Sequence, residues 1–562
     1  MEFSRAQNRL VLVLTSSLFL ASAGCLGVTS GNGGGSTTPS CPNITGNAWV
    51  PNVPGVSASN HDSSVQVSQQ VLTSLAAPIA GEGDPITGNE ITVHFTINQD
   101  LGLNGSVSLI AQASNVSPSL TPTISPLPFL TYLSDGTNEY INLTRGNNGA
   151  SCDSGIMTCD SGGKCDPNPN CAVGYPSAYG DFYHYLLHQT PTFGLDTVNT
   201  FPTCRWAEGT TGAGAAYTST SPACGFNTYL ASTQGHLPVG SYTAKYVLVS
   251  DNYASVSGTA DLKVTVVEKA DANAQPGGAL DFNVILVGSK NIQDSHTPAG
   301  QRNLNTLFKS VSDYLGTPNV NISIGKISVY EVGCENGGDS LALISTDNMG
   351  SLISSGSGLV DQGSQGKALN VFLISQFTGA TDAGVLGMSA AIGGPTINGL
   401  QTSGLTFATF NDLATFNSSC TTSPCPLTSQ DADFYEMGNT IAHESGHYLG
   451  LNHPSESGGT IHDNVYDTPV CTAVSGTSGG ITIGSCLNND TNIFAPTGQT
   501  CHQTCTGYNS ATGSYCPEAR ECGFNYMMWW SSKHFYPGTG AADGNLYSPD
   551  SGLIMNMNPF VQ

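Results

Sequence analysis

The stretch HESGHYLGLNH, residues 443–453, decides the fold expected of the chain around it. His443 and His447 are four residues apart, so on one helix both imidazoles point to the same side and can bind one metal ion. Gly450 can adopt the left-handed conformation that ends a helix. The turn after Gly450 is expected to bring His453 round as a third ligand.

The donor set in this stretch indicates both the metal and the reaction. Three neutral imidazoles suit Zn²⁺, and a catalytic zinc ion keeps three protein ligands and an open position for water. Glu444 adjoins the first histidine, so its carboxylate can take a proton from that water as the water attacks a carbonyl carbon. We therefore expect one zinc ion, with His443, His447 and His453 as its ligands and Glu444 as the general base.

Two later segments, together with the extended motif, carry a resemblance to a known family. HExxHxxGxxH followed by a methionine turn resembles the metzincin zinc endopeptidases. Residues 525–529 (NYMMW) are similar to that turn, which implies that Met527 is the apolar floor beneath the metal. Residues 463–469 (DNVYDTP), followed by Cys471, are similar to the DxVxDTP segment of the pappalysin (cytophagalysin) group. Trp529 stands where many members carry a tyrosine.

The resemblance covers about the last half of the chain and implies a function. It implies an endopeptidase whose protein or peptide substrates lie extended along an edge strand. Asp463 and Asp467 have two readings: they cap turns for local reasons, or they bind Ca²⁺ or form a specificity wall. The alternative to an enzyme is a surface binding or adhesion protein that keeps the metzincin half as a scaffold, which Trp529 favours. Chelator-sensitive cleavage of a protein substrate separates the two.

Composition favours an exported protein and excludes one class of partner. The chain has 562 residues, only 10% of them charged, and a formal net charge of −25. Nucleic acid is therefore not an expected partner, because binding phosphates needs an excess of lysine and arginine. The length has room for two or three domains. It gives no indication of an oligomeric state.

The first residues are typical of an export signal. Two arginines precede a short apolar run, and residues 22–25 (SAGC) resemble a bacterial lipobox, in which Cys25 is lipidated. We expect residues 1–25 to be a lipoprotein signal peptide and residues 26–45 a flexible tether to the bacterial membrane, at the surface or in the periplasm. Residues 21–23 (ASA) also fit an ordinary cleavage site, which would release the protein.

Seventeen cysteines indicate an oxidising compartment. Lipidation of Cys25 leaves sixteen, an even number for disulfides. Six cysteines lie between residues 152 and 224, and six between 471 and 522. The first four cysteines of the first cluster are too widely spaced for CxxC pairs, which favours disulfides over a structural zinc site there.

Residues 46–268 predict an all-β domain similar to an immunoglobulin or fibronectin sandwich. Apolar and polar residues alternate over 90–98, 106–113, 241–251 and 259–268. A cysteine-rich insertion is expected at about 147–235, and a linker at 269–279. His184 and His188 lie in that insertion, and we interpret them as part of a packed aromatic segment because no third ligand is evident.

Residues 280–562 predict an α+β peptidase domain, with a mixed sheet, an active-site helix and an irregular, disulfide-rich lower half. The expected elements are strands at 282–287, 320–330, 369–377 and 405–410, an edge strand within 384–394, and helices at 298–315, 431–449 and within 546–560. The chain is thus predicted to be multidomain, with the sandwich before the peptidase domain.

Overall fold

The computed structural model describes residues 53–72, 75–80, 88–117, 126–137, 139–142, 157–159, 165–167, 196–202, 237–250, 258–273, 275–287, 298–332, 343–344, 349–360, 368–374, 376–378, 385–400, 402–408, 427–451, 453, 527–528 and 547–562. Several predicted features lie outside these residues: the signal peptide with Cys25, the tether, most of the insertion with His184 and His188, and the loop with Asp463 and Asp467.

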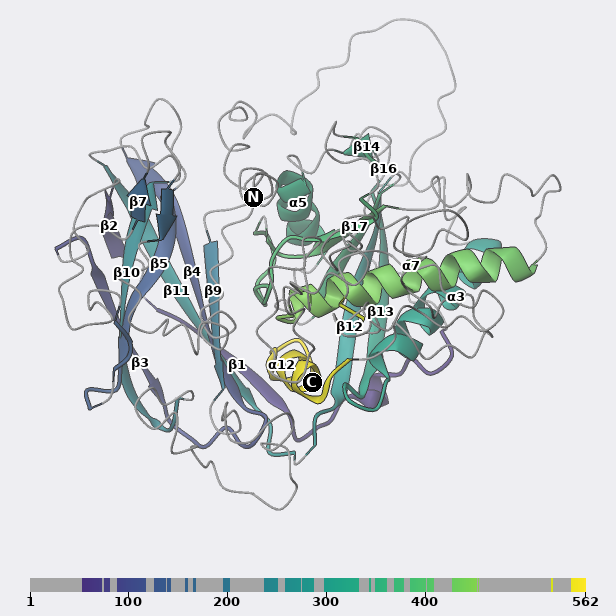
Figure 1. Cartoon of the computed structure of the whole chain (residues 1–562), viewed down its shortest axis with the longest axis horizontal. Coiled ribbons are helices and arrows are strands. Elements are labelled where there is room, and N and C mark those ends of the chain that lie inside the picture. The colour runs from purple at the N-terminus through teal and green to yellow at the C-terminus, as the bar shows by residue number, and fades with distance from the viewer. Residues whose placement is uncertain are drawn as a thin grey trace, which may run out of the picture.

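Nine strands of the first half form one curled sheet (Figure 1). These are β1 (Gln66–Val71), β2 (Leu75–Ala80), β3 (Ile91–Ile97), β4 (Ser106–Ser117), β5 (Pro126–Ser134), β6 (Glu139–Asn142), β9 (Asp196–Pro202), β10 (Gly240–Ser250) and β11 (Thr259–Ala270). The order is β6-β5-β10-β2-β11-β4-β9, while β1 pairs with β11 and β3 pairs with β10. β2 pairs in parallel with β10 and antiparallel with β11, so it joins two groups of strands into the curled sheet.

The alternating runs predicted as strands are present as β3, β4, β10 and β11. Successive side chains of a strand point to opposite faces, and in β3 the buried residues alternate with more exposed ones. Tyr242 of β10 stacks on Phe95 of β3 with ring centroids 5.1 Å apart, and its hydroxyl donates to the carbonyl of Pro238. Within the expected insertion, β7 (Met157–Cys159) and β8 (Cys165–Pro167) form a short antiparallel pair.

The second half is built on a five-stranded sheet with the order β13-β12-β15-β18-β17. Its strands are β12 (Gly278–Val287), β13 (Ile322–Val332), β15 (Ala368–Ile374), β17 (Gly387–Ser389) and β18 (Leu405–Ala408). Four of them are parallel and β17 runs antiparallel at one edge, so the sheet is mixed, as predicted. All seven residues of β15 are buried, as expected of a parallel strand covered on both faces.

Helices cover both faces of this sheet. α3 (Pro298–Leu315) packs against α7 (Leu427–Tyr448) and shares one apolar cluster with it and with alternate residues of the strands. α5 (Met349–Val360) packs on the other face, against Ile285 and Phe372. The remaining described pair, β14 (Leu343–Ile344) and β16 (Gln376–Phe377), is parallel.

Several boundaries differ from those predicted. α7 begins four residues before the expected start and ends one residue earlier, while β17 covers only three residues of the expected edge-strand region. β11 continues through Ala270 and β12 begins at Gly278, so the connection is shorter than the expected linker 269–279. Lys269 and Ala270 extend β11 beyond the predicted strand because they pair with Val67 and Gln66 of β1. α5 was not predicted.

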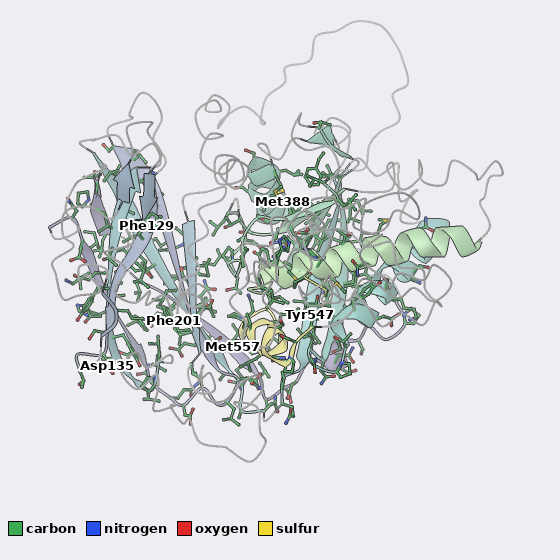
Figure 2. The ribbon with its side chains drawn as sticks, viewed as in Figure 1. Phe129, Asp135, Phe201, Met388, Tyr547 and Met557 are labelled. Atoms are coloured by element: carbon green, nitrogen blue, oxygen red, sulfur yellow. The ribbon has the colours of Figure 1, made fainter. Side chains whose placement is uncertain are left out.

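The C-terminal segment lies between the two halves. α12 (Pro549–Met557) is followed by a tail in which Val561 pairs antiparallel with Leu280 at the start of β12. Met557 faces the β-rich half, whereas Tyr547, just before the helix, lies next to α7 (Figure 2). One apolar cluster runs from the curled sheet through α12 to α3 and α7, so the two halves share a core. Among the described residues, no helix is long and apolar enough to cross a membrane.

Candidate metal centre

α7 carries the first two histidines on a helix that is packed closely on the rest of the domain. Met437, Ile441 and Tyr448 recur at helical spacing and form its buried stripe. Gly438 allows the close approach to α3, because a Cβ atom there would lie 2.3 Å from Ser310 Oγ. The orientation of α7 is therefore determined by its contacts with α3 and the sheet.

The turn after α7 redirects the chain as predicted. Gly450 has a φ of +119°, a conformation that a residue with a Cβ atom adopts only with strain. Its N–H donates to the carbonyl of His447 at 2.9 Å, and the N–H of Leu451 donates to the carbonyl of Gly446, also at 2.9 Å. These bonds satisfy carbonyls at the helix end. The turn brings His453 back to the two helical histidines.

The three imidazoles converge through their Nε2 atoms. His453 Nε2 lies 3.0 Å from His447 Nε2 and 3.2 Å from His443 Nε2. His443 Nδ1 lies 2.8 Å from the carbonyl of Met527, and His447 Nδ1 lies 2.7 Å from the carbonyl of Leu451. Because a carbonyl only accepts, both Nδ1 atoms must donate. The Nε2 atoms of these two histidines therefore point their lone pairs towards the common centre.

This geometry can hold a metal ion. Four ligands at about 2.0–2.1 Å in a tetrahedral arrangement place neighbouring nitrogen atoms about 3.3 Å apart. The two Nε2 separations, 3.2 Å and 3.0 Å, are close to that value. His443, His447 and His453 are the group of described residues whose donor atoms are close enough to ligate one ion.

Two buried methionines lie beside α7 at the predicted methionine turn. Met527 contributes more than an apolar side chain, since its carbonyl orients His443 and its Sδ accepts from Asn439 Nδ2 at 3.4 Å. Met528 packs on Gly446, where a Cβ atom would lie 2.4 Å from its Sδ. The sequence pointed to Met527 as the floor and placed Met528 in the same turn without a role, whereas Asn439 was missed because no spacing rule connects it to the motif.

Glu444 lies beside this cluster, between α7 and β17. Its side chain is buried, and Oε2 accepts a 2.7 Å hydrogen bond from the main-chain N–H of Ser389. Burial raises the pKa of Glu444 to about 7, although the charge of His453 and the hydrogen bond from Ser389 act in the opposite direction. Gly387 leaves the space for this carboxylate, because a Cβ atom there would lie 2.8 Å from Glu444 Cγ. Neither Ser389 nor Gly387 was identified from the sequence.

In comparisons with known proteins, no family model and no curated protein sequence matched this chain. Of the predicted site residues, the structure brings together His443, Glu444, His447, His453 and Met527.

Proposed function

We propose that the chain is a zinc-dependent endopeptidase, related to the metzincins of the pappalysin (cytophagalysin) group. The observation that carries the proposal is the convergence of three imidazole Nε2 atoms with a buried carboxylate from the same helix next to them. Zinc suits this site because its donors are neutral imidazoles and because three protein ligands leave a fourth position open. A binding site alone has no need of a general base in this place.

When bound, the zinc ion supplies Lewis-acid chemistry, polarising a substrate carbonyl and making a water molecule more acidic. Glu444 takes one proton from the attacking water, whose oxygen forms the new bond to the carbonyl carbon. As the C–N bond of the peptide breaks, Glu444 passes this proton to the leaving amine nitrogen. The position of Glu444 suits both transfers, because its buried carboxylate lies beside the imidazoles that would hold the zinc ion.

The edge strand provides a place for the substrate. β17 pairs with β18 on one side and is the last strand of the sheet as far as the structure describes it. An extended peptide can add to such an edge through main-chain hydrogen bonds. Ser389 at the end of β17 already contacts Glu444, so a peptide on this strand would lie next to the general base. We therefore propose extended segments of proteins or peptides as substrates.

We also propose that the β-rich half is an immunoglobulin-like sandwich. The hydrogen bond from the Tyr242 hydroxyl to a carbonyl four residues upstream resembles the tyrosine corner of immunoglobulin-like sandwiches, which favours that assignment. We also propose an exported lipoprotein attached to the bacterial membrane through Cys25, with a released extracellular form as the alternative. We further propose Asp463 and Asp467 as ligands of a calcium ion.

The test is a digestion assay on the exported chain, comparing wild type with Glu444→Ala on an unfolded protein substrate. We expect wild type to cleave the substrate and a zinc chelator to abolish cleavage. Glu444→Ala should retain one zinc ion while turnover falls by about 10²–10⁴-fold. Full activity in Glu444→Ala would contradict the mechanism. Absence of both zinc and cleavage in wild type would favour the surface binding protein instead.

A further inference from the structure

Two elements hold the end of α7, from which the chain turns to His453. From one side, Gly393 N–H donates to the carbonyl of His447 at 3.0 Å, and Gly394 N–H donates to the carbonyl of Tyr448 at 2.8 Å. From the other side, Asn558 Nδ2, just after α12, donates to the same Tyr448 carbonyl at 3.3 Å.

α12 and the residues on either side of it make further contacts with α7. The rings of Phe560 and Tyr448 pack edge to face with centroids 5.5 Å apart. Ile554 lies against the turn, because a Cβ atom on Gly450 would be 3.0 Å from its Cγ2. Before the helix, the Tyr547 hydroxyl donates to the carbonyl of Ala442 at 3.1 Å, next to the first metal-binding histidine. The position of α12 therefore constrains the α7 segment that carries the histidines and the turn that follows it.

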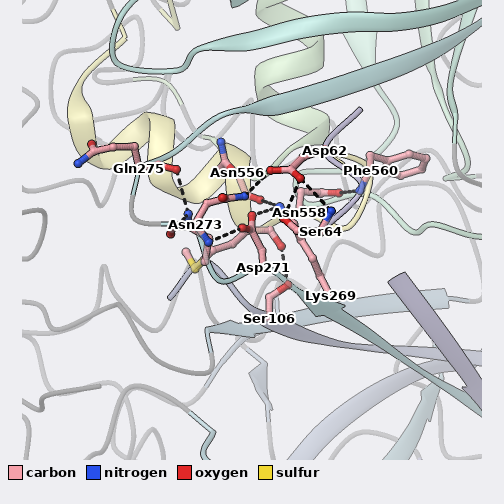
Figure 3. A network of polar contacts seen from close by, with 12 residues as sticks. Asp62, Ser64, Ser106, Lys269, Asp271, Asn273, Gln275, Asn556, Asn558 and Phe560 are labelled. Atoms are coloured by element: carbon pink, nitrogen blue, oxygen red, sulfur yellow. Dashed lines mark hydrogen bonds and ion pairs between the residues drawn. The ribbon is translucent and has the colours of Figure 1, made fainter. Parts of the chain in front are cut away.

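The β-rich half fixes the position of α12 in turn. Ser106 Oγ at the start of β4 donates to the carbonyl of Met557 at 2.5 Å, and Lys269 Nζ at the end of β11 donates to the carbonyl of Asn556 (Figure 3). These carbonyls belong to the last two residues of α12, where helical carbonyls lack partners within the helix and carry partial negative charge. A hydroxyl and an ammonium group from another part of the fold thus cap this helix.

Lysine is an unusual residue at position 269, because the position is fully buried. The ammonium group of Lys269 lies 3.3 Å from Asp271 Oδ2, which is also fully buried. A buried charge is costly unless it is paired and hydrogen-bonded, and an apolar side chain of similar size would fill the space without that cost. What lysine adds is a directed contact with the end of α12.

The second element that holds α7 also rests on the β-rich half. Ile397 and Leu400 follow the glycines that contact the helix end, and both pack on the cluster of Ile110, Val198 and Val267 from three strands of the curled sheet. Both supports of the metal-binding helix are therefore in contact with the first half of the chain.

We propose that Ser106 and Lys269 are positioning residues for the metal centre, acting through α12 on the end of α7 and on the turn to His453. In this account the β-rich half is a structural part of the metal site. The inference rests on the proposed metal site, and it adds residues that are remote from the histidines in the sequence.

The test uses Co²⁺ as a spectroscopic probe in the full exported chain, with Lys269→Met and Ser106→Ala compared with wild type. The control is Lys245→Met, which removes a lysine of the same half whose ammonium group pairs with Glu90 Oε2 at 3.1 Å. We expect the visible absorption of bound Co²⁺ to shift in both test variants and its dissociation constant to rise about tenfold. Lys245→Met should bind Co²⁺ like wild type. A general loss of stability would lower the melting temperature without changing the spectrum.

The other possible results would overturn either the role of Ser106 and Lys269 or the metal site itself. If wild type binds Co²⁺ and both test variants give the same spectrum and affinity, the inference is overturned while the proposed site stands. If wild type binds no Co²⁺, the proposed metal site fails, and this inference fails with it. Should Lys269→Met not fold, Ser106→Ala decides by the same two readouts, since it removes one hydroxyl group and leaves no buried charge unpaired.

Discussion

The main-chain N–H of Ser389 donates a 2.7 Å hydrogen bond to Glu444 Oε2, which joins the edge strand β17 to the helix that carries the histidines. This bond fixes one oxygen of a buried carboxylate whose pKa burial raises to about 7. The strand proposed to bind substrate therefore also orients the proposed general base, and changes in β17 should affect catalysis as well as binding.

Gly387→Ala tests that relationship. The new Cβ atom would lie 2.8 Å from Glu444 Cγ and 3.0 Å from Thr440 Cγ2, so the carboxylate must move. We expect kcat/KM to fall about 10²-fold, because small displacements of a catalytic group are costly, while zinc content stays at one ion. The control is Gly358→Ala in α5, where the nearest atom to a Cβ would be at 3.7 Å. Wild-type kcat/KM in Gly387→Ala would show that Glu444 does not depend on this space.

Gly450→Ala tests the turn that delivers His453. Its φ of +119° makes an alanine strained, which should lower the free energy of unfolding by about 1–2 kcal/mol. We also expect weaker zinc binding in a chelator competition, because relief of the strain displaces the third ligand. Gly136→Ala is the matched control, with a φ of +87° and no atom within 4 Å of the new Cβ. It should lose stability by a similar amount and bind zinc like wild type; equal zinc affinity in the two variants would refute the role of the turn.

Metal removal should destabilise the protein through these histidines. A ligand at 100 times its dissociation constant stabilises the native state by about 2.7 kcal/mol. We therefore expect a chelator to lower the melting temperature of wild type and to leave that of His447→Ala unchanged. His61→Ala is the control, since His61 pairs with Asp281 at 2.8 Å, outside the metal-binding group. It should keep the response of wild type, and a chelator effect that persists in His447→Ala would place the metal elsewhere.

Lys269 should make stability depend on pH. Burial lowers its pKa to about 8, although the charge of Asp271 acts in the opposite direction. Between that pH and the pKa of an unfolded lysine, the unfolded chain binds a proton that the native state lacks, so stability rises with pH. The shift corresponds to about 3 kcal/mol for this fully buried group. From pH 8 to pH 10, the free energy of unfolding of wild type should therefore increase relative to that of Lys269→Met. A constant difference would contradict the lowered pKa.

Local signals explain which parts of the fold and site could be predicted. The three histidines, Glu444 and Gly450 lie within eleven residues, so helical periodicity and one glycine were enough to bring them together. α3 begins at Pro298, as predicted, because a proline fits the first turn of a helix and the following apolar residues keep helical spacing.

The remaining features depend on tertiary contacts. α5 was missed because its sequence, MGSLISSGSGLV, is rich in glycine and serine, and packing against the sheet stabilises it in spite of its low helix propensity. Ser389 could not be predicted, because it acts through its main-chain N–H, a group that every residue except proline has. Lys269 resembled the start of a polar linker, since a charged residue is rarely buried unless it is paired. Its partners, Asp271 and the end of α12, become apparent only from the fold.

X-ray absorption at the zinc edge tests the central claim most directly. On the full exported chain loaded with one zinc ion, we expect imidazole nitrogen ligands at about 2.0–2.1 Å and no sulfur ligand. In His453→Ala the spectrum should lose one imidazole. Because the chain has seventeen cysteines, a zinc–sulfur distance of about 2.3 Å is the informative opposite result. It would show that zinc binds to cysteines, and the assignment of His443, His447 and His453 as a catalytic metal site would be wrong.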